Sequence, residues 1–198
     1  MPLRNRVTPY GEIVAIPERG TLMGNRGVIH ADDGSHRREW QVRRWIACRL
    51  EFKGRQRPVR PPRRWTELFF LDEATALAAG HRPCAECRRE DYRRWQAAWP
   101  HGATGADAMD LVLHASRLDG KAKRTYAAAL EELPEGVIVE RGGAPFLVAA
   151  GALRPWSAAG YGAPAAAPAG EIVTVLTPEA TVATIAAGYA VSLHPSIS

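Results

Sequence analysis

The amino-acid sequence predicts an α+β protein with a β-rich amino-terminal module and a smaller α+β region after it. Two observations predict this class. Short apolar runs broken by Gly, Pro and Asp occupy residues 10–71, and helical patterns appear from residue 73 onward. The charge also changes near residue 100: residues 1–100 hold 20 Lys and Arg against 12 Asp and Glu, whereas residues 101–198 hold 6 against 9. We therefore expect two regions, 1–100 and 101–198.

The strands expected in the first region are short and end at turn-forming residues. They cover 10–16, 28–30, 40–52 and 67–71. In the third of these strands, alternate residues share one face of a sheet, and that face is apolar. It carries Ile46, Cys48, Leu50 and Phe52. The segment 53–64 is rich in proline and arginine, so we expect an extended, exposed loop there.

Two helices are expected before residue 100. Asp72 is placed to cap a short helix over 73–79, and Gly80 is placed to end it. A longer helix is expected over 85–99 because aromatic residues recur there at helical spacing and Pro100 stops the pattern. This aromatic stripe predicts a face that packs into the core.

The second region predicts helices and strands in alternation. We expect helices at 106–118 and 121–133, and strands at 137–139, 146–148 and 172–176. The segment 156–170 is rich in Ala, Pro and Gly, which is typical of a surface loop. The sequence Thr177-Pro178-Glu179 predicts the start of a last helix that ends at Gly188.

The cysteines predict a metal site. Cys84 and Cys87 form a Cys-x-x-Cys turn, which lets both sulfur atoms point at one ion, and Cys48 is the candidate third ligand. We expect the fourth ligand to be a histidine, with His30 preferred over His36, and the ion to be zinc. Three cysteines are too few for a disulfide scaffold, which favours a reducing, cytoplasmic setting, and no apolar run is long enough to span a membrane.

The arginines of the first region predict a nucleic-acid partner. Between Arg37 and Arg64 there are 11 basic residues against Glu39 and Glu51. Guanidinium groups suit bidentate phosphate contacts, so we expect a surface that binds nucleic acid, with DNA as the preferred polymer. The candidate contact residues are Arg43, Arg44, Arg55, Arg57, Arg60, Arg63, Arg64, Arg88 and Arg89.

Residues 40–90 resemble the amino-terminal zinc domain of Ada-type methylphosphotriester DNA repair proteins. The stretch Phe70 to Cys87 is similar to the family segment that supplies the second pair of zinc cysteines, with His81 at an aromatic position. The segment around Cys48 is similar to the one whose cysteine is both zinc ligand and methyl acceptor. The family's next cysteine ligand lies four residues further on, where this chain has Phe52. The resemblance implies a zinc-domain fold, contact with DNA backbone and a role in DNA repair or processing.

Two alternatives stay open on the residues alone. A nucleic-acid enzyme needs carboxylates or histidines near one another to hold Mg²⁺ or activate water. Such candidates are Asp32, Asp33, His30 and His36 in one hairpin, or Asp107, Asp110 and His114 on one helix face. The other alternative is a structural or protein-interaction protein that uses zinc only to hold its fold.

Overall fold

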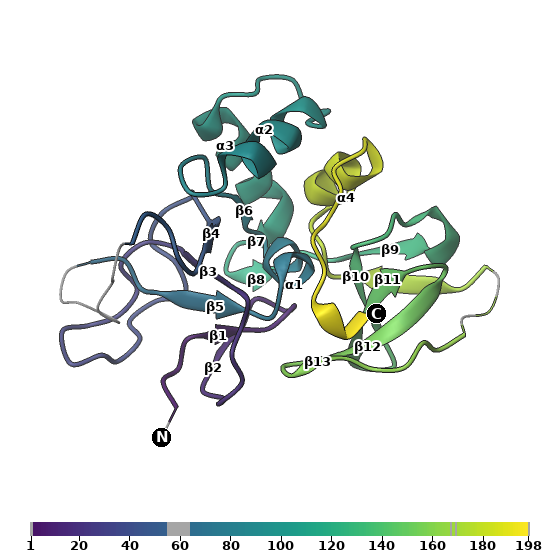
Figure 1. Ribbon diagram of the computed structural model, residues 1–198. Coiled ribbons are helices and arrows are strands. Elements are labelled where there is room, and N and C mark those ends of the chain that lie inside the picture. The colour runs from purple at the N-terminus through teal and green to yellow at the C-terminus, as the bar shows by residue number, and fades with distance from the viewer. Residues whose placement is uncertain (1, 55–63, 167, 169, 198) are drawn as a thin grey trace.

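The computed structural model describes residues 2–54, 64–166, 168 and 170–197. Its strands and helices form two six-stranded sheets with helices between and above them, so the predicted α+β class is confirmed. Figure 1 shows the first sheet beside the second, with helix α1 between them. Among the described residues, no helix combines the length and the apolar character needed to cross a membrane.

The first sheet has the strand order β2-β1-β5-β3-β4-β6. Its strands are β1 (Arg6–Val7), β2 (Ile13–Val14), β3 (Leu22–Asn25), β4 (Ile46–Arg49), β5 (Leu68–Phe70) and β6 (Arg82–Pro83). β4 runs parallel to β6 and antiparallel to β3. The predicted strands at 40–52 and 67–71 are therefore present but shorter. The stretch 28–30 contributes only a bridge between His30 and His36.

Helix α1 (Glu73–Ala78) begins and ends as the sequence predicts. Asp72 accepts a hydrogen bond from the backbone N–H of Thr75 at 2.9 Å, and Gly80 has a φ of 87° just after the helix. Every residue of α1 is buried. Ala76 packs against the first sheet and Ala74 and Ala78 pack against the second. The alanines fit this position because small side chains let both sheets approach one helix.

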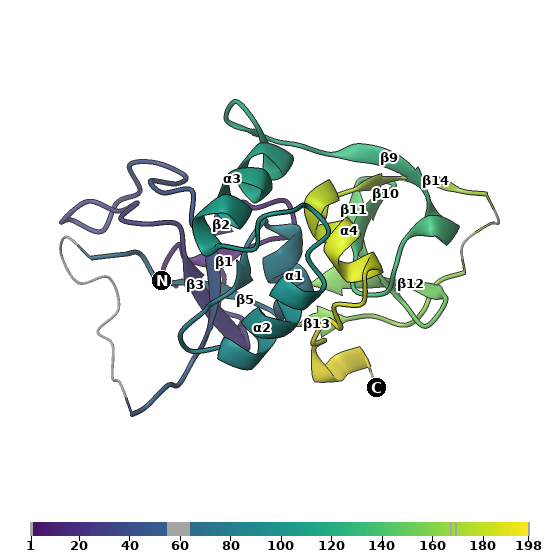
Figure 2. The same cartoon turned by 90° about the horizontal axis from the view of Figure 1, so that it is seen from above.

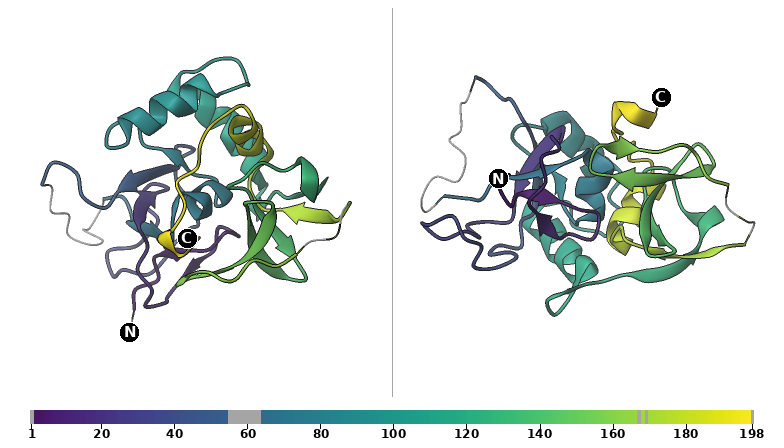
Figure 3. Two further views of the ribbon diagram at one scale, coloured as in Figure 1. Left: turned by 45° about the vertical axis from the view of Figure 1, so that its right-hand side comes forward. Right: turned by 90° about the horizontal axis from the view of Figure 1, so that it is seen from below.

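The other helices are α2 (Arg89–Ala97), α3 (Ala106–Arg117) and α4 (Glu179–Ala186). Helix α2 begins four residues later than predicted, because 85–88 form turns around the second cysteine. Its aromatic stripe is buried, as expected, and Trp95 is stacked edge-on against Tyr189 at 5.0 Å. In the left view of Figure 3 the teal helices α2 and α3 lie above the sheets.

The second sheet has the strand order β13-β12-β11-β10-β14-β9. Its strands are β9 (Tyr126–Ala129), β10 (Ile138–Arg141), β11 (Ala144–Ala149), β12 (Ala152–Ser157), β13 (Gly160–Tyr161) and β14 (Ile172–Val175). A hairpin of β7 (Leu118–Asp119) and β8 (Ala122–Lys123) precedes it. There are also two short 3-10 helices, Leu130–Glu132 after β9 and Pro195–Ile197 after α4.

Two predictions for the second region are wrong. The predicted helix at 121–133 is the hairpin strand β8, strand β9 and a single 3-10 turn. Tyr126 to Ala129 pair antiparallel with Val175 to Ile172, so a tertiary pairing overrides the helix propensity of alanine. The predicted loop at 156–170 contains the end of β12 and β13, which pair through Trp156 and Tyr161.

The largest buried cluster contains residues from both sides of position 100. Tyr92, Trp95 and Trp99 pack there with Leu113 of α3 and Val175 of β14, among others. Helices α3 and α4 pack against each other over this core and are seen from above in Figure 2. The boundary between 1–100 and 101–198 stays a prediction, and the hydrophobic contacts run across it.

Candidate functional site

Strands β4 and β6 bring the three cysteines together. Their parallel pairing sets Ala47 opposite Pro83, and the N–H of Cys84 donates to the carbonyl of Ala47 at 2.9 Å. Cys48 is therefore carried on one strand directly beside the turn that holds Cys84 and Cys87. The three sulfur atoms all lie within 4.8 Å of one another, and all three residues are buried. This group can hold a metal ion.

The surroundings of the sulfur atoms are apolar, apart from peptide N–H groups. Met23, Ile46 and Phe69 pack against the cysteines. The thiols of Cys48 and Cys87, and then the peptide N–H groups of Cys87 and Glu86, donate to the sulfur of Cys84 and lower the pKa of that thiol. The N–H of Arg49 donates to the sulfur of Cys87. Peptide donors of this kind stabilise negative charge on sulfur, which a metal ion requires of its ligands.

His30 is not brought to the cysteines, so its prediction as the fourth ligand is corrected. Its Nδ1 atom lies 2.6 Å from the Oγ1 atom of Thr66, and it forms a strand bridge with His36. The N–H of Ile29 also bonds to Thr66 Oγ1, at 3.0 Å. These contacts tie the 29–36 hairpin to Thr66, just before β5, instead of to the end of β4.

The described residues supply three ligands to this group. Within the described ranges, no His, Asp or Glu joins the three sulfur atoms. The remaining positions, 1, 55–63, 167, 169 and 198, contain no Cys, His, Asp or Glu in the sequence. Phe52, where the Ada-type pattern has a cysteine, is partly buried and packs against the cysteine group.

The predicted arginine surface is present in part. Arg43, Arg44, Arg64 and Arg89 are exposed, and Arg49 beside Cys48 is exposed as well. Among the described residues, no carboxylate forms an ion pair with any of these five. Figures 1 and 2 show that the segment around 49–54 lies on the side of the first sheet that faces away from the second, whereas Arg43 and Arg44 line a hollow beside Asp107 and Asp110 of α3. The predicted contact residues Arg55, Arg57, Arg60 and Arg63 lie outside the described residues.

Arg88 does not belong to that surface. It is buried, and its guanidinium group pairs with Glu73 at 2.7 Å and with Asp91 at 2.8 Å. Glu73 also accepts from the hydroxyl of Tyr189 at 2.6 Å and from the N–H of Ser192 at 2.9 Å. Arg88 therefore links α1, α2 and the carboxyl-terminal segment inside the protein, and the prediction that it contacts nucleic acid is wrong.

Neither of the alternative metal clusters forms. Asp110 is engaged in a buried bidentate pair with Arg82, at 2.9 and 2.7 Å. His114 lies 4.6 Å from the ring of Trp40 and 3.0 Å from a guanidinium nitrogen of Arg117. Among the described residues, the cysteine group is the one set of three or more potential ligands that converges. Asp110 is thus a structural residue of α3.

Sequence reasoning missed a second group of charged residues. Arg26, Arg117 and Lys123 converge on a cleft beside Trp45. A signal was present, because four of the six basic residues of 101–198 fall within 117–124. Their convergence with Arg26 depends on how the β7–β8 hairpin folds against the first sheet.

Comparison of the chain with protein-family models, with curated proteins and with solved structures finds no match. The resemblance to the Ada-type zinc domain stays a prediction, and the chemistry of this protein has to be argued from its own residues.

Proposed function

We propose that this is a zinc-binding protein of the cytoplasm that contacts DNA through the arginine surface beside its metal centre, in DNA repair or processing. The convergence of Cys48, Cys84 and Cys87 is the observation that carries the proposal. The exposed arginines, of which Arg49 ends the cysteine strand and Arg89 begins α2, support the second half of the proposal. The Ada-type resemblance supports the choice of DNA and of repair.

Zinc is the ion that fits the donor set best. Thiolate ligands select Zn²⁺, Cu⁺ or iron–sulfur clusters, and an isolated mononuclear thiolate site favours Zn²⁺. Tetrahedral zinc with bonds of about 2.3 Å needs sulfur atoms about 3.8 Å apart. Sulfur atoms that all lie within 4.8 Å reach this arrangement by small side-chain rotations. A fourth ligand is not found among the residues that the structure describes, so a water or another external ligand would complete the coordination of the zinc ion.

The arginines fit a polyanion because, in the part of the chain that the structure describes, none of the five forms an ion pair with a carboxylate. Arg49 directly follows Cys48 and Arg89 comes two positions after Cys87, while Arg43, Arg44 and Arg64 are further exposed arginines of residues 1–100. An arginine side chain without a carboxylate partner neutralises a phosphate at little cost in lost ion pairs. Contacts of this kind bind the DNA backbone and read little sequence.

Metal analysis tests the first half of the proposal. The chain purified from zinc-supplemented medium should carry about one zinc ion, and Cys84→Ser should lose it. His30→Ala is the matched control and should keep the metal. Replacing zinc with Co²⁺ gives thiolate absorption bands that report the sulfur ligands directly in folded protein. Wild-type protein that stays free of metal under these conditions contradicts the proposal.

Fluorescence anisotropy with a labelled DNA duplex tests the second half. Affinity should fall steeply with salt, and each phosphate contact removed should reduce the log–log slope by about 0.9. The triple variant Arg43→Gln, Arg44→Gln, Arg64→Gln should therefore bind more weakly and with a flatter slope. Arg94→Gln is the control, since Arg94 is exposed but already paired with Asp91. Binding that does not change with salt contradicts the DNA contact.

A further inference from the structure

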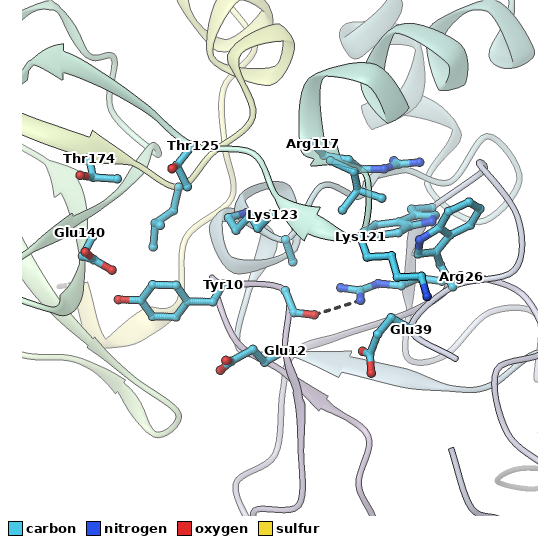
Figure 4. A pocket seen from close by; sticks show the side chains of 16 residues that line it. Tyr10, Glu12, Arg26, Glu39, Arg117, Lys121, Lys123, Thr125, Glu140 and Thr174 are labelled. Carbon is cyan, nitrogen blue, oxygen red and sulfur yellow. Dashed lines mark hydrogen bonds between the residues drawn. The ribbon is translucent and has the colours of Figure 1, made fainter. Parts of the chain in front are cut away.

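A cleft of about 470 Å³ lies between the first sheet, the β7–β8 hairpin and the second sheet. Its volume falls in the range of about 300–1,000 Å³ that is usual for small-molecule sites. Figure 4 shows Arg26 and Lys121 at one end and Tyr10 and Glu140 at the other, with Lys123 between them. The cysteine group does not line this cleft.

Arg26 is a buried cation, and no carboxylate among the described residues forms an ion pair with it. Burial lowers its pKa, and Glu39 is near enough to raise the pKa against that effect. Arg26 is 2 % exposed and directly follows β3, where it lines the cleft. One guanidinium nitrogen, Nη1, donates to the carbonyl of Gly11 at 2.9 Å, and Nε donates to Nε2 of His81 at 3.4 Å. Its other terminal nitrogen, Nη2, is buried and has no hydrogen-bond acceptor among the residues that the structure describes. A buried N–H without an acceptor is destabilising, and more so on a charged group.

Arg117, at the end of α3, repeats this arrangement. It is 1 % exposed and donates to the carbonyls of Gly80 and Arg43, while its Nε atom has no acceptor in the described part of the chain. Arg26 and Arg117 also share one aromatic partner. Their guanidinium carbons lie 4.1 and 4.0 Å from the ring centre of Trp45. The two buried guanidinium groups thus both lie against the indole ring of Trp45. Each also has one N–H donor without an acceptor among the described residues.

Two lysines add to the positive charge. Lys123 reaches inward and donates to the carbonyl of Ala78 at 2.6 Å, and Lys121 is exposed at the rim. The cleft is also lined by Glu12, Glu39 and Glu140. Among the described residues, none of these carboxylates forms an ion pair with the two arginines or the two lysines.

We infer that this cleft binds a phosphate monoester, with Arg26 and Arg117 as buried donors and Lys121 as a donor at the rim. A phosphate monoester offers three acceptor oxygens and up to two negative charges. It therefore supplies the acceptors and the opposite charge that these two guanidinium groups do not find among the described residues. Trp40 lines the same cleft and is partly exposed, so a nucleotide base has an aromatic ring to stack on. A nucleotide is the monoester that fits both features. This inference stands on the cation cluster and does not rest on the zinc proposal.

Calorimetric titration of the full chain tests the inference. The probes are inorganic phosphate, deoxyadenosine monophosphate, deoxyadenosine, and one oligonucleotide with and without a 5′-phosphate, all at constant ionic strength. The phosphate-bearing probes should bind saturably and the nucleoside should not. Tighter binding of the mononucleotide identifies a free nucleotide, and tighter binding of the phosphorylated strand identifies a strand end. Absence of saturable binding by every phosphate-bearing probe overturns the inference.

Paired variants separate the cleft from the general charge of the protein. Lys121→Gln should weaken mononucleotide binding about tenfold. Arg93→Gln removes the same charge from exposed α2, outside the cleft, and should leave the affinity unchanged. Equal weakening by both variants overturns the inference. Arg26→Lys keeps the positive charge but loses the planar guanidinium group, and it should lower mononucleotide affinity at least as much as Lys121→Gln does. If Arg26→Lys does not fold, the comparison of Lys121→Gln with Arg93→Gln decides the test. Arg43→Gln should reduce DNA-backbone binding without changing mononucleotide affinity, so the two proposals fail separately.

Discussion

Replacement of Asp110 by alanine should destabilise the protein strongly. Asp110 on α3 and Arg82 on β6 form two hydrogen bonds, at 2.9 and 2.7 Å, and their side chains are only 4 % and 2 % exposed. Asp110→Ala leaves a buried guanidinium group with two donors that have lost their acceptor. Breaking a buried pair in this way costs about 3–5 kcal/mol, and two buried unsatisfied donors at about 1–3 kcal/mol each give a similar figure. For a chain of this size, the melting temperature should fall by about 6–20 °C.

Urea and thermal denaturation followed by circular dichroism measure this loss. Arg94→Ala is the control, because it breaks the pair between Asp91 and an Arg94 side chain that is 57 % exposed, and surface pairs contribute about 0–1 kcal/mol. A loss for Asp110→Ala no larger than the loss for Arg94→Ala refutes the reasoning. The double variant Arg82→Met, Asp110→Leu should recover most of the stability, since it removes the stranded charge as well.

Three other outcomes follow from the cysteine group, the cleft and the turn after α1. Phe52→Cys adds a sulfur next to the cysteine group and should tighten zinc binding about tenfold or more in competition with a chromophoric chelator; unchanged affinity contradicts the placement. Burial and the charge of Arg26 lower the pKa of Lys123 to about 7, so this lysine is protonated below pH 7 and loses its charge above it. Binding of sulfate, whose own charge is constant, should weaken about tenfold between pH 6 and 8, and Lys123→Met should abolish this dependence. The other charged groups of the cleft are Glu12, Arg26, Glu39, Arg117, Lys121 and Glu140. Gly80→Ala places a Cβ atom 2.6 Å from Cδ of Arg117 at a φ of 87° and should cost about 2–5 kcal/mol in urea denaturation, whereas Gly188→Ala, with a positive φ but open space, should cost about 1–2 kcal/mol. Equal losses for the two glycines contradict the contact with Arg117.

Local patterns in the sequence predicted the elements that are set by residues close together in the chain, such as a helix cap, a turn glycine or a pair of cysteines. Asp72 and Gly80 mark the ends of α1 in the local sequence, and Asp72 additionally accepts from the hydroxyl of Tyr161 and the N–H of His194 in the folded chain. The spacing of Cys84 and Cys87 likewise predicts a shared ion from the turn alone, and the apolar face of 46–52 predicts that Cys48 points inward. The parallel pairing of β4 with β6 then brings all three cysteines together.

Only the tertiary structure decided the features that depend on partners far away in the chain. The segment 126–129 reads as helix, yet it is a strand because β14 offers it a paired edge. Arg88 reads as a surface arginine, yet Glu73 lies within reach once α1 and α2 pack. Arg26 and Arg117 are 91 positions apart in the sequence and meet on Trp45. A basic residue has the same local signature whether solvent, a carboxylate or an indole surrounds it, so its role is set by packing.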